Sequence, residues 1–437
     1  MILFSENITN RLEFVCEFIG QQIFNQPIQV TNDRSTYLAS NGPKINYSST
    51  SLANEELQVV PHKLLFETSI TSQKVHCKVI NGNKALFTNE KDGYPFDIFS
   101  AIFYILSRYE EYLPHNKDEY GRYSYKESLA FKEGFLHLPL VNFWLEDLKS
   151  AIREKCPSVL FHRKTFKFIP TYDIDIAWKY KHKGWWRNIG GCLHSAFKGN
   201  WSDLKERIGV LQDTQKDPFE AYEWLDALHL YCRLKPYYFF LLAETQRGYD
   251  KNISPSDKHL QQLIAYHAAR DKVGIHPSWQ SGDNMKLLKE EIGWLEFITG
   301  NKTKFSRQHY IRFELPRTYE ELIQAGIEKD FSMGYGNING FRASVASSFK
   351  WFNLATNQTT PLTIFPFCFM DANAYYEQKL TAQQAFAELM QVYQAVKKVN
   401  GMMITIWHNN FLGGEKAFQS WKKVYELFLK DEVYWDG

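Results

Sequence analysis

The sequence predicts an α/β protein in which a distorted parallel (β/α) barrel over residues 163–437 follows a smaller α+β domain over residues 1–162. Three observations predict this division. Apolar segments of strand length alternate with amphipathic segments of helix length over the ~270 residues after Thr165, as in parallel sheets covered by helices. That alternation is absent before residue 160. A chain of 437 residues is also too long for one compact core.

The first 160 residues hold short apolar segments between polar, turn-rich ones, which predicts strands and hairpins. Examples are residues 63–66 and residues 85–87, the latter after a turn at 81–83. Asp97 predicts the N-cap of a helix, because apolar residues recur behind it at helical spacing. A second helix is expected over 141–154, and the domain boundary is expected between Pro157 and Thr165.

The second part predicts elements in strict alternation. Strands are expected at 166–172, 236–242, 272–276, 305–310, 330–333, 362–369 and 402–407. Helices are expected at 217–232, 257–269, 284–298, 319–325, 382–398 and at the C-terminus. The near-continuous apolar segment 236–242 is typical of a strand buried on both faces of a parallel sheet.

Polar residues follow four of these strands, at the carboxyl end where such barrels hold their functional groups. Asp173 and Asp175 end the first strand, His276 ends the third, Arg307 lies in the next, and His408 follows the last. A solvated turn would explain the Asp pair alone, and a core position would explain a single His. Their occurrence together at neighbouring strand ends predicts one site.

This order, D-x-D, G-x-H, an Arg-bearing strand and a late apolar strand ending in His, resembles the NodB-type polysaccharide deacetylases (carbohydrate esterase family four) over residues 165–437. The resemblance implies a barrel of that type and a metal-dependent removal of N-acetyl groups. It implies that Asp173 is the general base, that Arg307 orients it and that His408 is the general acid. Asp175 and His276 would bind the metal.

The sequence departs from that family at the second His of the H-x-x-x-H segment, where Gln280 stands. His309, two residues after Arg307 and so on the same face of the predicted strand, is the candidate third ligand. A water molecule in its place and loss of the metal are the alternatives. Carboxylate and imidazole ligands suit zinc, with cobalt, nickel or manganese as further possibilities.

The chemistry of these residue types agrees with the resemblance. A divalent cation held by Asp and His lowers the pKa of a water molecule and polarises an acetyl carbonyl. A carboxylate kept off the metal can take the proton of that water, and a nearby imidazole can protonate the leaving amine.

Candidate substrate-binding residues are less specific. Trp178, Trp185 and Trp186 belong to an aromatic, basic segment that follows the Asp pair. We expect a loop that stacks on sugar rings and holds an anionic substrate, or a solvated loop whose rings fold onto the barrel. Trp279 follows His276 and is a further candidate. Arg342 would bring a second guanidinium into the site, or form a surface salt bridge.

Composition limits the partners and the compartment. The 51 Lys and Arg nearly balance 49 Asp and Glu, which argues against nucleic-acid binding. Six scattered cysteines without a C-x-x-C pair fit neither a disulfide framework nor a zinc–thiolate site. The N-terminus lacks a leader pattern, and no apolar stretch reaches the ~20 residues of a transmembrane helix. We therefore expect a cytoplasmic protein without a transmembrane segment.

The leading hypothesis is a metal-dependent deacetylase acting on an amino-sugar or polysaccharide. A carbohydrate-binding protein that kept the barrel and lost the metal is the alternative, together with a hydrolase of another amide or ester. The sequence leaves the sugar, the role of the first domain and the oligomeric state open.

Overall fold

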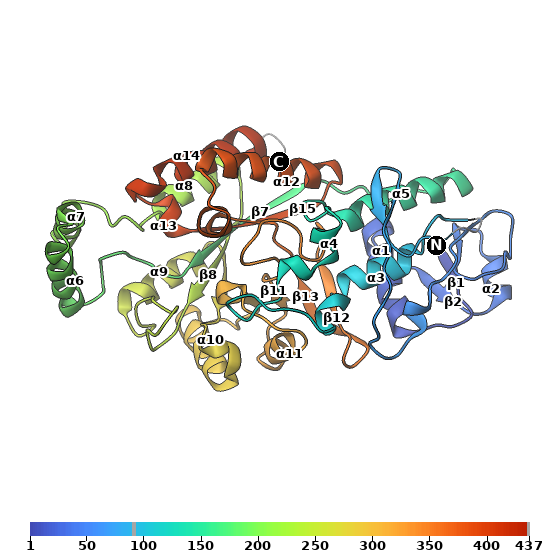
Figure 1. Cartoon of the computed structure of the whole chain (residues 1–437), viewed down its shortest axis with the longest axis horizontal. Helices are drawn as coiled ribbons and strands as arrows, with labels where there is room; N and C mark the ends of the chain where they lie inside the picture. Colours follow the sequence, from blue (N-terminus) through green and yellow to red (C-terminus); the bar gives the residue numbers. More distant parts are fainter. Residues whose placement is uncertain (90–92, 435–437) are drawn as a thin grey trace.

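The computed structural model describes residues 1–89 and 93–434 of the chain. The molecule is elongated, with a small sheet near the N-terminus at one end and the helical pair α6–α7 at the other (Figure 1). A larger sheet lies between them and carries the strand ends singled out above.

The small sheet has four strands in the order β2-β1-β3-β4, and all its pairs are parallel. Its elements are β1 (Ile2–Phe4), α1 (Asn10–Phe24), β2 (Gln29–Thr31), α2 (Arg34–Ala39), β3 (Lys44–Asn46) and β4 (Glu56–Gln58). The expectation of hairpins is wrong here, because helices connect the first three strands and parallel strands need such crossovers. The chain at Lys63–Phe66 forms a 3₁₀ turn instead of a strand.

One expected hairpin is confirmed. β5 (Lys78–Ile80) and β6 (Asn83–Ala85) pair antiparallel around the predicted turn. Three helices follow, namely α3 (Ile98–Leu106), α4 (Leu129–Lys132) and α5 (Leu140–Lys155). Asp97 caps α3 as predicted, since its carboxylate accepts hydrogen bonds from the backbone amides of Phe99 and Ser100 at 3.1 and 3.0 Å.

The larger sheet has nine strands in the order β12-β13-β11-β10-β9-β8-β7-β15-β14. They are β7 (Lys167–Ile174), β8 (Tyr237–Leu241), β9 (Lys272–His276), β10 (Phe305–Ser306), β11 (Lys329–Asp330), β12 (Phe349–Asn353), β13 (Gln358–Ile364), β14 (Phe369–Met370) and β15 (Met402–His408). Every pair is parallel except β12–β13. The predicted α/β architecture with a mainly parallel sheet is therefore confirmed.

On one side of β7 the parallel strands follow chain order from β8 through β11 to β13, and on its other side lie β15 and then β14. Among the described strands β13 and β14 do not pair. Closure of the barrel thus stays a prediction. The expected single strand over 362–369 is wrong, because its residues are divided between the end of β13 and the start of β14.

Helices flank the sheet on two sides, with α8, α12, α13 and α14 along one side and α9, α10 and α11 along the other (Figure 1). Their bounds are α8 (Tyr222–Cys232), α9 (Lys258–Ala268), α10 (Met285–Thr299), α11 (Arg317–Gln324), α12 (Ala382–Lys398), α13 (Asn409–Leu412) and α14 (Gln419–Leu427). α8 begins five residues later than expected. Asp217, expected at its start, instead accepts hydrogen bonds at 2.8 Å from the backbone amides of Lys179 and Tyr180.

The segment expected to be a loop after Asp175 is partly helical. Helices α6 (Trp185–Phe197) and α7 (Trp201–Leu211) form a pair that projects from the body of the molecule (Figure 1). Two glycines inside α6 and the absence of an N-cap side chain obscure this helix in the sequence.

The N-terminal part is packed against the larger sheet through α1 and α3, which contact β12. The division of the chain between residues 162 and 163 stays a prediction. In the described part of the chain, no helix is both long and apolar enough to cross a bilayer.

Candidate metal centre

The candidate residues meet because five parallel strands end along one edge of the sheet. The register pairs His408 of β15 with Asp173 of β7, and His276 of β9 with Leu241 of β8. Arg307 follows directly after β10, the next strand along. Side chains from β15, β7, β9 and β10 therefore converge at one edge of the sheet.

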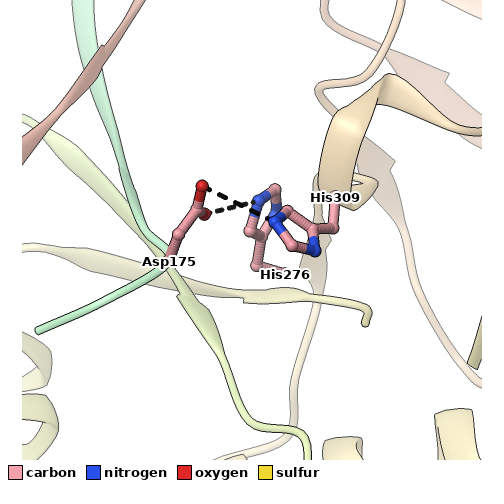
Figure 2. A group of neighbouring side chains, drawn as sticks. All are labelled: Asp175, His276 and His309. Atoms are coloured by element: carbon pink, nitrogen blue, oxygen red, sulfur yellow. Dashed lines mark ion pairs between the residues drawn. The ribbon is translucent and has the colours of Figure 1, made fainter. Parts of the chain in front are cut away.

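Three imidazoles surround the carboxylate of Asp175. The Nε2 atom of His276 lies 3.1 Å from Asp175 Oδ1, and the Nε2 atoms of His309 and His408 each lie 3.6 Å from Oδ2. Figure 2 shows His276 and His309 side by side, facing Asp175. Their ring centres are 5.0 Å apart, which is close enough for both imidazoles to bind one metal ion at ligand distances of about 2 Å.

Each of these imidazoles is held by its other ring nitrogen, Nδ1. The acceptors are the backbone oxygen of Arg307 for His276 (2.5 Å), Asp250 for His309 (3.0 Å) and Asp371 for His408 (2.6 Å). Hydrogen bonds of this kind fix the tautomer of a ligating histidine and turn Nε2 toward the metal. All three rings are thus held so that their Nε2 atoms face the carboxylate of Asp175.

The donor set fits a divalent cation. In their neutral form, the imidazoles direct three nitrogen lone pairs at a carboxylate, an arrangement that repels itself unless a cation or protons lie between. Among the described residues, the buried Oδ1 atom of Asp175 has no hydrogen-bond partner. Asp175, His276 and His309 hold donor atoms that all lie within 4.8 Å of one another, which is compatible with one small ion.

The pKa values respond to the same crowding. Burial lowers the pKa of His309, but the carboxylates of Asp175 and Asp250 outweigh it and raise that pKa to about 9. For His408 burial again opposes the change, and Asp371 with Asp175 raises the pKa to about 10. Burial alone would raise the pKa of Asp175, yet the surrounding imidazoles hold it well below its usual range. Positive charge is therefore favoured at this point.

Asp173 lies beside the group formed by Asp175 and the three imidazoles but is not part of it. Its Oδ1 atom accepts a hydrogen bond of 2.9 Å from Nη1 of Arg307, and its Oδ2 atom lies 3.8 Å from Nε2 of His276. Arg307 is fully buried, and it also donates to the hydroxyl of Thr171 at 2.6 Å and to the backbone oxygen of Phe331 at 3.1 Å. One carboxylate oxygen is thus held by the guanidinium and the other faces the histidines.

A packing constraint explains the glycine of the G-x-H segment. A Cβ atom on Gly274 would lie 2.7 Å from the ring of Phe239, which in turn packs 4.5 Å from the guanidinium carbon of Arg307. The glycine lets that ring lie beneath the arginine, where it supports the arginine's position.

Gln280 does not take the place of a ligand. Its amide nitrogen Nε2 donates to Oδ2 of Asp250 at 3.0 Å, while Oδ1 of Asp250 holds His309. Asp250 is buried, and it also accepts from the backbone amide of Trp279 at 2.8 Å. The residue that departs from the family pattern therefore supports the carboxylate that orients the candidate replacement ligand.

His309 reaches the site for a reason other than the expected one. β10 ends at Ser306, and His309 begins a 3₁₀ turn in which Tyr310 has a φ of 58°. The expectation of a strand running to residue 310 is wrong, because the chain leaves the sheet and the turn points the imidazole at Asp175.

An aromatic cluster borders the histidines. Trp279 lies with Tyr249 and Tyr310 at ring-centre distances of 4.4 and 5.7 Å, and Tyr120 from the N-terminal part packs 5.5 Å from Tyr310. The ring of Tyr310 is 4.8 Å from that of His309. Flat, partly exposed rings of this kind offer surfaces on which a sugar can stack.

The other expected substrate contacts lie elsewhere. Trp178 is buried in the core. Trp185 and Trp186 are exposed at the start of α6, where they stack on each other with ring centres 3.7 Å apart. Arg342 is buried and donates to both carboxylate oxygens of Glu111 at 2.8 and 2.6 Å. A buried ion pair thus accounts for Arg342, in place of the surface salt bridge considered above.

Sequence reasoning missed Asp250, Asp371 and the tyrosines of the aromatic cluster. Asp371 follows the two-residue strand β14, and Asp250 lies in a loop well after β8, so neither stands where a strand end could be recognised. A Met-Asp step after an apolar segment was the only local signal for Asp371.

A second group that could hold a metal in the described part of the chain is Asp226, His267 and Asp271. Arg270 lies 3.8 Å from the Asp226 carboxylate, so a positive charge already adjoins that group. Among the residues that the structure describes, Asp175 forms ion pairs with histidines and with no Lys or Arg, so its group is the stronger candidate.

Comparisons with known proteins match parts of the chain. Residues 1–157 match a family of unknown function, DUF7033. No curated protein matches the sequence.

The solved structures to which the chain is similar, at low levels of identity, include two polysaccharide deacetylases and an allantoinase. A candidate polysaccharide deacetylase from Mycobacterium smegmatis is 13% identical with a TM-score of 0.39, covering 63% of this chain and 86% of that one. A polysaccharide deacetylase from Bacillus cereus is 12% identical with a TM-score of 0.30, covering 62% and 89%. The allantoinase Puue is 9% identical with a TM-score of 0.38, covering 62% and 89%. At these levels the function has to be argued from the site itself.

Proposed function

We propose that the protein is a metal-dependent hydrolase that removes N-acetyl groups from an amino-sugar or polysaccharide. The observation that carries the proposal is that the two neighbouring carboxylates, those of Asp173 and Asp175, have different surroundings. Asp175 faces three imidazole Nε2 atoms, whereas Asp173 is held off that group by Arg307 with one oxygen directed at it. A ligand and a base placed side by side are what water activation requires.

Asp175, His276 and His309 would hold the cation, zinc being the best match to one carboxylate and two imidazoles. When bound, a divalent cation supplies Lewis acidity toward an amide carbonyl and lowers the pKa of a nearby water molecule. His408, whose Nε2 atom lies 3.6 Å from Asp175 Oδ2, stays available for proton transfer.

The residues of this chain then divide the proton transfers. Oδ2 of Asp173 takes a proton as the water oxygen bonds to the acetyl carbon, while Arg307 keeps Oδ1 fixed. Nε2 of His408 gives a proton to the amide nitrogen as the carbon–nitrogen bond breaks, and Asp371 holds the resulting imidazole in place. The products are acetate and a free amine, and each residue regains its starting protonation through solvent.

The aromatic cluster supports a carbohydrate as the substrate. Trp279, Tyr249 and Tyr310 border His309, so a sugar stacked there would lie next to the candidate metal centre. Trp279 is also fixed through its backbone amide to Asp250, which ties the aromatic surface to the histidine support.

The direct test is acetate release from N-acetylated amino-sugars and their oligomers by protein loaded with zinc, cobalt, nickel or manganese. We expect turnover that chelation removes and metal restores. Binding of such sugars without acetate release, in protein shown by elemental analysis to be metal-loaded, would contradict the proposal and favour a carbohydrate-binding protein. Turnover of other amides or esters alone would favour the broader hydrolase.

A further inference from the structure

The helices α6 and α7 present a set of large apolar side chains to solvent. Those of α6 are Trp185, Trp186, Ile189, Leu193 and Phe197, with exposed fractions of 61%, 71%, 45%, 67% and 94%, and those of α7 include Trp201 and Leu211 at 67% and 44%. The spacing in α6 places its five residues on one side of the helix. A surface of this size on a single hairpin needs an occupant.

The side of α6 that faces the protein is polar. Asn188 donates to the backbone oxygen of Tyr180 at 3.1 Å, and the hydroxyl of Ser195 donates to Asp203 of α7. Gly191 allows the guanidinium of Arg207 to pass against the helix, where a Cβ would lie 2.2 Å from Nη1. The usual amphipathic arrangement is thus reversed, and the apolar side chains do not serve the fold of the hairpin.

The hairpin projects at the end of the molecule opposite the N-terminal sheet (Figure 1). No other element crosses its outer side in that view. Its apolar surface can therefore meet a large, flat object without a clash from the body of the protein.

The segment that leads into and forms α6 carries charge of one sign, whereas α7 carries Asp203 and Glu206 beside Lys205 and Arg207. Residues 178–200 contain five Lys and Arg and no Asp or Glu. Lys179 and Lys181 form ion pairs with acidic residues outside that segment, and the ion pairs of the described residues engage none of the remaining three, Lys183, Arg187 and Lys198. The positive charges of Arg187 and Lys198, which are exposed on α6 and directly after it, therefore stay available at the surface of the hairpin.

A pocket of about 610 Å³ opens beside the start of α6. Lys183, Arg187 and Lys258 line it together with two histidines and Asp257, whose carboxylate is occupied in capping α9. Because lysine and arginine bind phosphate oxygens, the pocket suits the phosphate of a lipid headgroup.

We propose that the α6–α7 hairpin docks the protein on an anionic phospholipid surface. The helix of 13 residues is about 20 Å long and would lie flat at the level of the headgroups. Tryptophan prefers that region, and basic residues beside an apolar face bind anionic lipids. Pairing with a second copy through the same face is disfavoured, because two-fold symmetry would bring the two sets of uncompensated positive charges together.

The test is co-sedimentation of the full-length protein with vesicles of phosphatidylcholine alone or with about one-third phosphatidylglycerol. We expect binding to the anionic vesicles, weakened by salt because screening acts on the exposed charges. Trp186→Ser with Phe197→Ser should weaken binding at least roughly tenfold, and Arg187→Glu with Lys198→Glu should do the same.

Matched controls separate these effects from general changes. Leu230→Ser with Phe297→Ser removes apolar residues that are 82% and 72% exposed elsewhere, and Lys289→Glu with Lys423→Glu makes the same change in net charge. Both should bind vesicles as the parent does, and all four variants should keep its circular dichroism spectrum and melting temperature.

Three outcomes would overturn the proposal. The first is that the parent binds neither kind of vesicle. The second is that the control variants lose as much vesicle binding as the hairpin variants. The third is that the parent is a dimer that Trp186→Ser with Phe197→Ser makes monomeric while vesicle binding is unchanged. The last result would assign the surface to contacts between copies of the chain. Acetate release plays no part in the test, so it is independent of the proposed function.

Discussion

Asp371 accepts a hydrogen bond of 2.6 Å from Nδ1 of His408 and a second, of 2.7 Å, from the backbone amide of the same residue. The carboxylate is fully buried, whereas the His408 side chain keeps some exposure. This double contact fixes both the ring and the chain at the end of β15. Nε2 of His408 is thereby directed at Asp175.

Asp371→Asn is expected to lower kcat for acetate release roughly tenfold to a hundredfold, because an amide cannot hold the imidazole in the required charge state and orientation. Metal content should stay the same, since Asp371 does not face the candidate ligands. The measurement pairs steady-state kinetics with elemental analysis. A loss of metal equal to the loss of activity would instead place His408 among the ligands.

Asp173→Asn and His408→Ala should each lower turnover by roughly a hundredfold or more, the usual scale for general acid–base catalysis. Both variants should bind metal as the parent does, because neither side chain belongs to the group formed by Asp175, His276 and His309. Rates near those of the parent in both variants would defeat the proposed mechanism.

Asp175→Ala and His276→Ala are expected to abolish stoichiometric binding of zinc, measured by calorimetry on protein freed of metal. Asp250→Asn should weaken zinc binding by roughly 10- to 100-fold, as loss of a carboxylate that supports a ligating histidine does. Asp257→Asn, which alters the N-cap of α9, is the matched control and should leave zinc affinity unchanged. Unchanged affinity in Asp250→Asn would exclude His309 as a ligand.

The sequence was informative where periodicity and capping agree. β9 and α12 have the predicted bounds, and Asp97 caps its helix as predicted. The helices expected from residues 257 and 284 begin one residue later, because Asp257 and Asn284 are their N-caps. Hydrophobic periodicity and capping predict these elements correctly because the tertiary packing of the elements favours the same boundaries as the local sequence. The short strands β10 and β11 were predicted too long, and β14 was not separated from β13, since tertiary packing alone decides where a two-residue strand ends.

The candidate site was predictable only in part. Asp173, Asp175, His276 and His408 lie at the ends of regular strands, which made their convergence foreseeable. The residues that orient the imidazoles come from loops, and no spacing rule connects Asp250 to His309 across 59 positions. Arg342 was placed in the site because the sequence gives no sign that its partner would be Glu111, far earlier in the chain.

The surroundings of Glu111 predict an effect on stability that is unrelated to the candidate metal centre. It is buried between Arg108 and Arg342, which lie at 2.7 and 2.6 Å from its carboxylate oxygens and hold its pKa at about 2 against the opposing effect of burial. Glu111→Ala would leave the buried guanidinium of Arg342 without its carboxylate partner and Arg108 with Glu110 alone, at a cost of about 3–5 kcal/mol in the free energy of unfolding.

Denaturant titration measures this loss. Glu133→Ala is the control, because its ion pair with Lys84 is about one-third exposed and should contribute no more than about 1 kcal/mol. Equal, small effects in the two variants would mean that the buried pair does not stabilise the packing of the N-terminal part against the rest.

Glu291 predicts a pH dependence of stability. Burial raises its pKa from 4.5 to about 7, although hydrogen bonds from Ser278 oppose this. Between those two values the folded state holds a proton that the unfolded state has lost, so the free energy of unfolding falls as pH rises from about 4.5 to 7. The full decrease is on the order of 3 kcal/mol and is complete above pH 7.

Glu291→Gln should remove this component, since a neutral amide can still accept the hydrogen bond from the Ser278 backbone and does not titrate. The variant should therefore gain stability relative to the parent between pH 5 and pH 8, and the gain should grow with pH, as followed by urea unfolding at a series of pH values. Glu290→Gln, at an exposed position on the same helix, should keep the parent's slope. An unchanged slope in Glu291→Gln would show that another group titrates in this range.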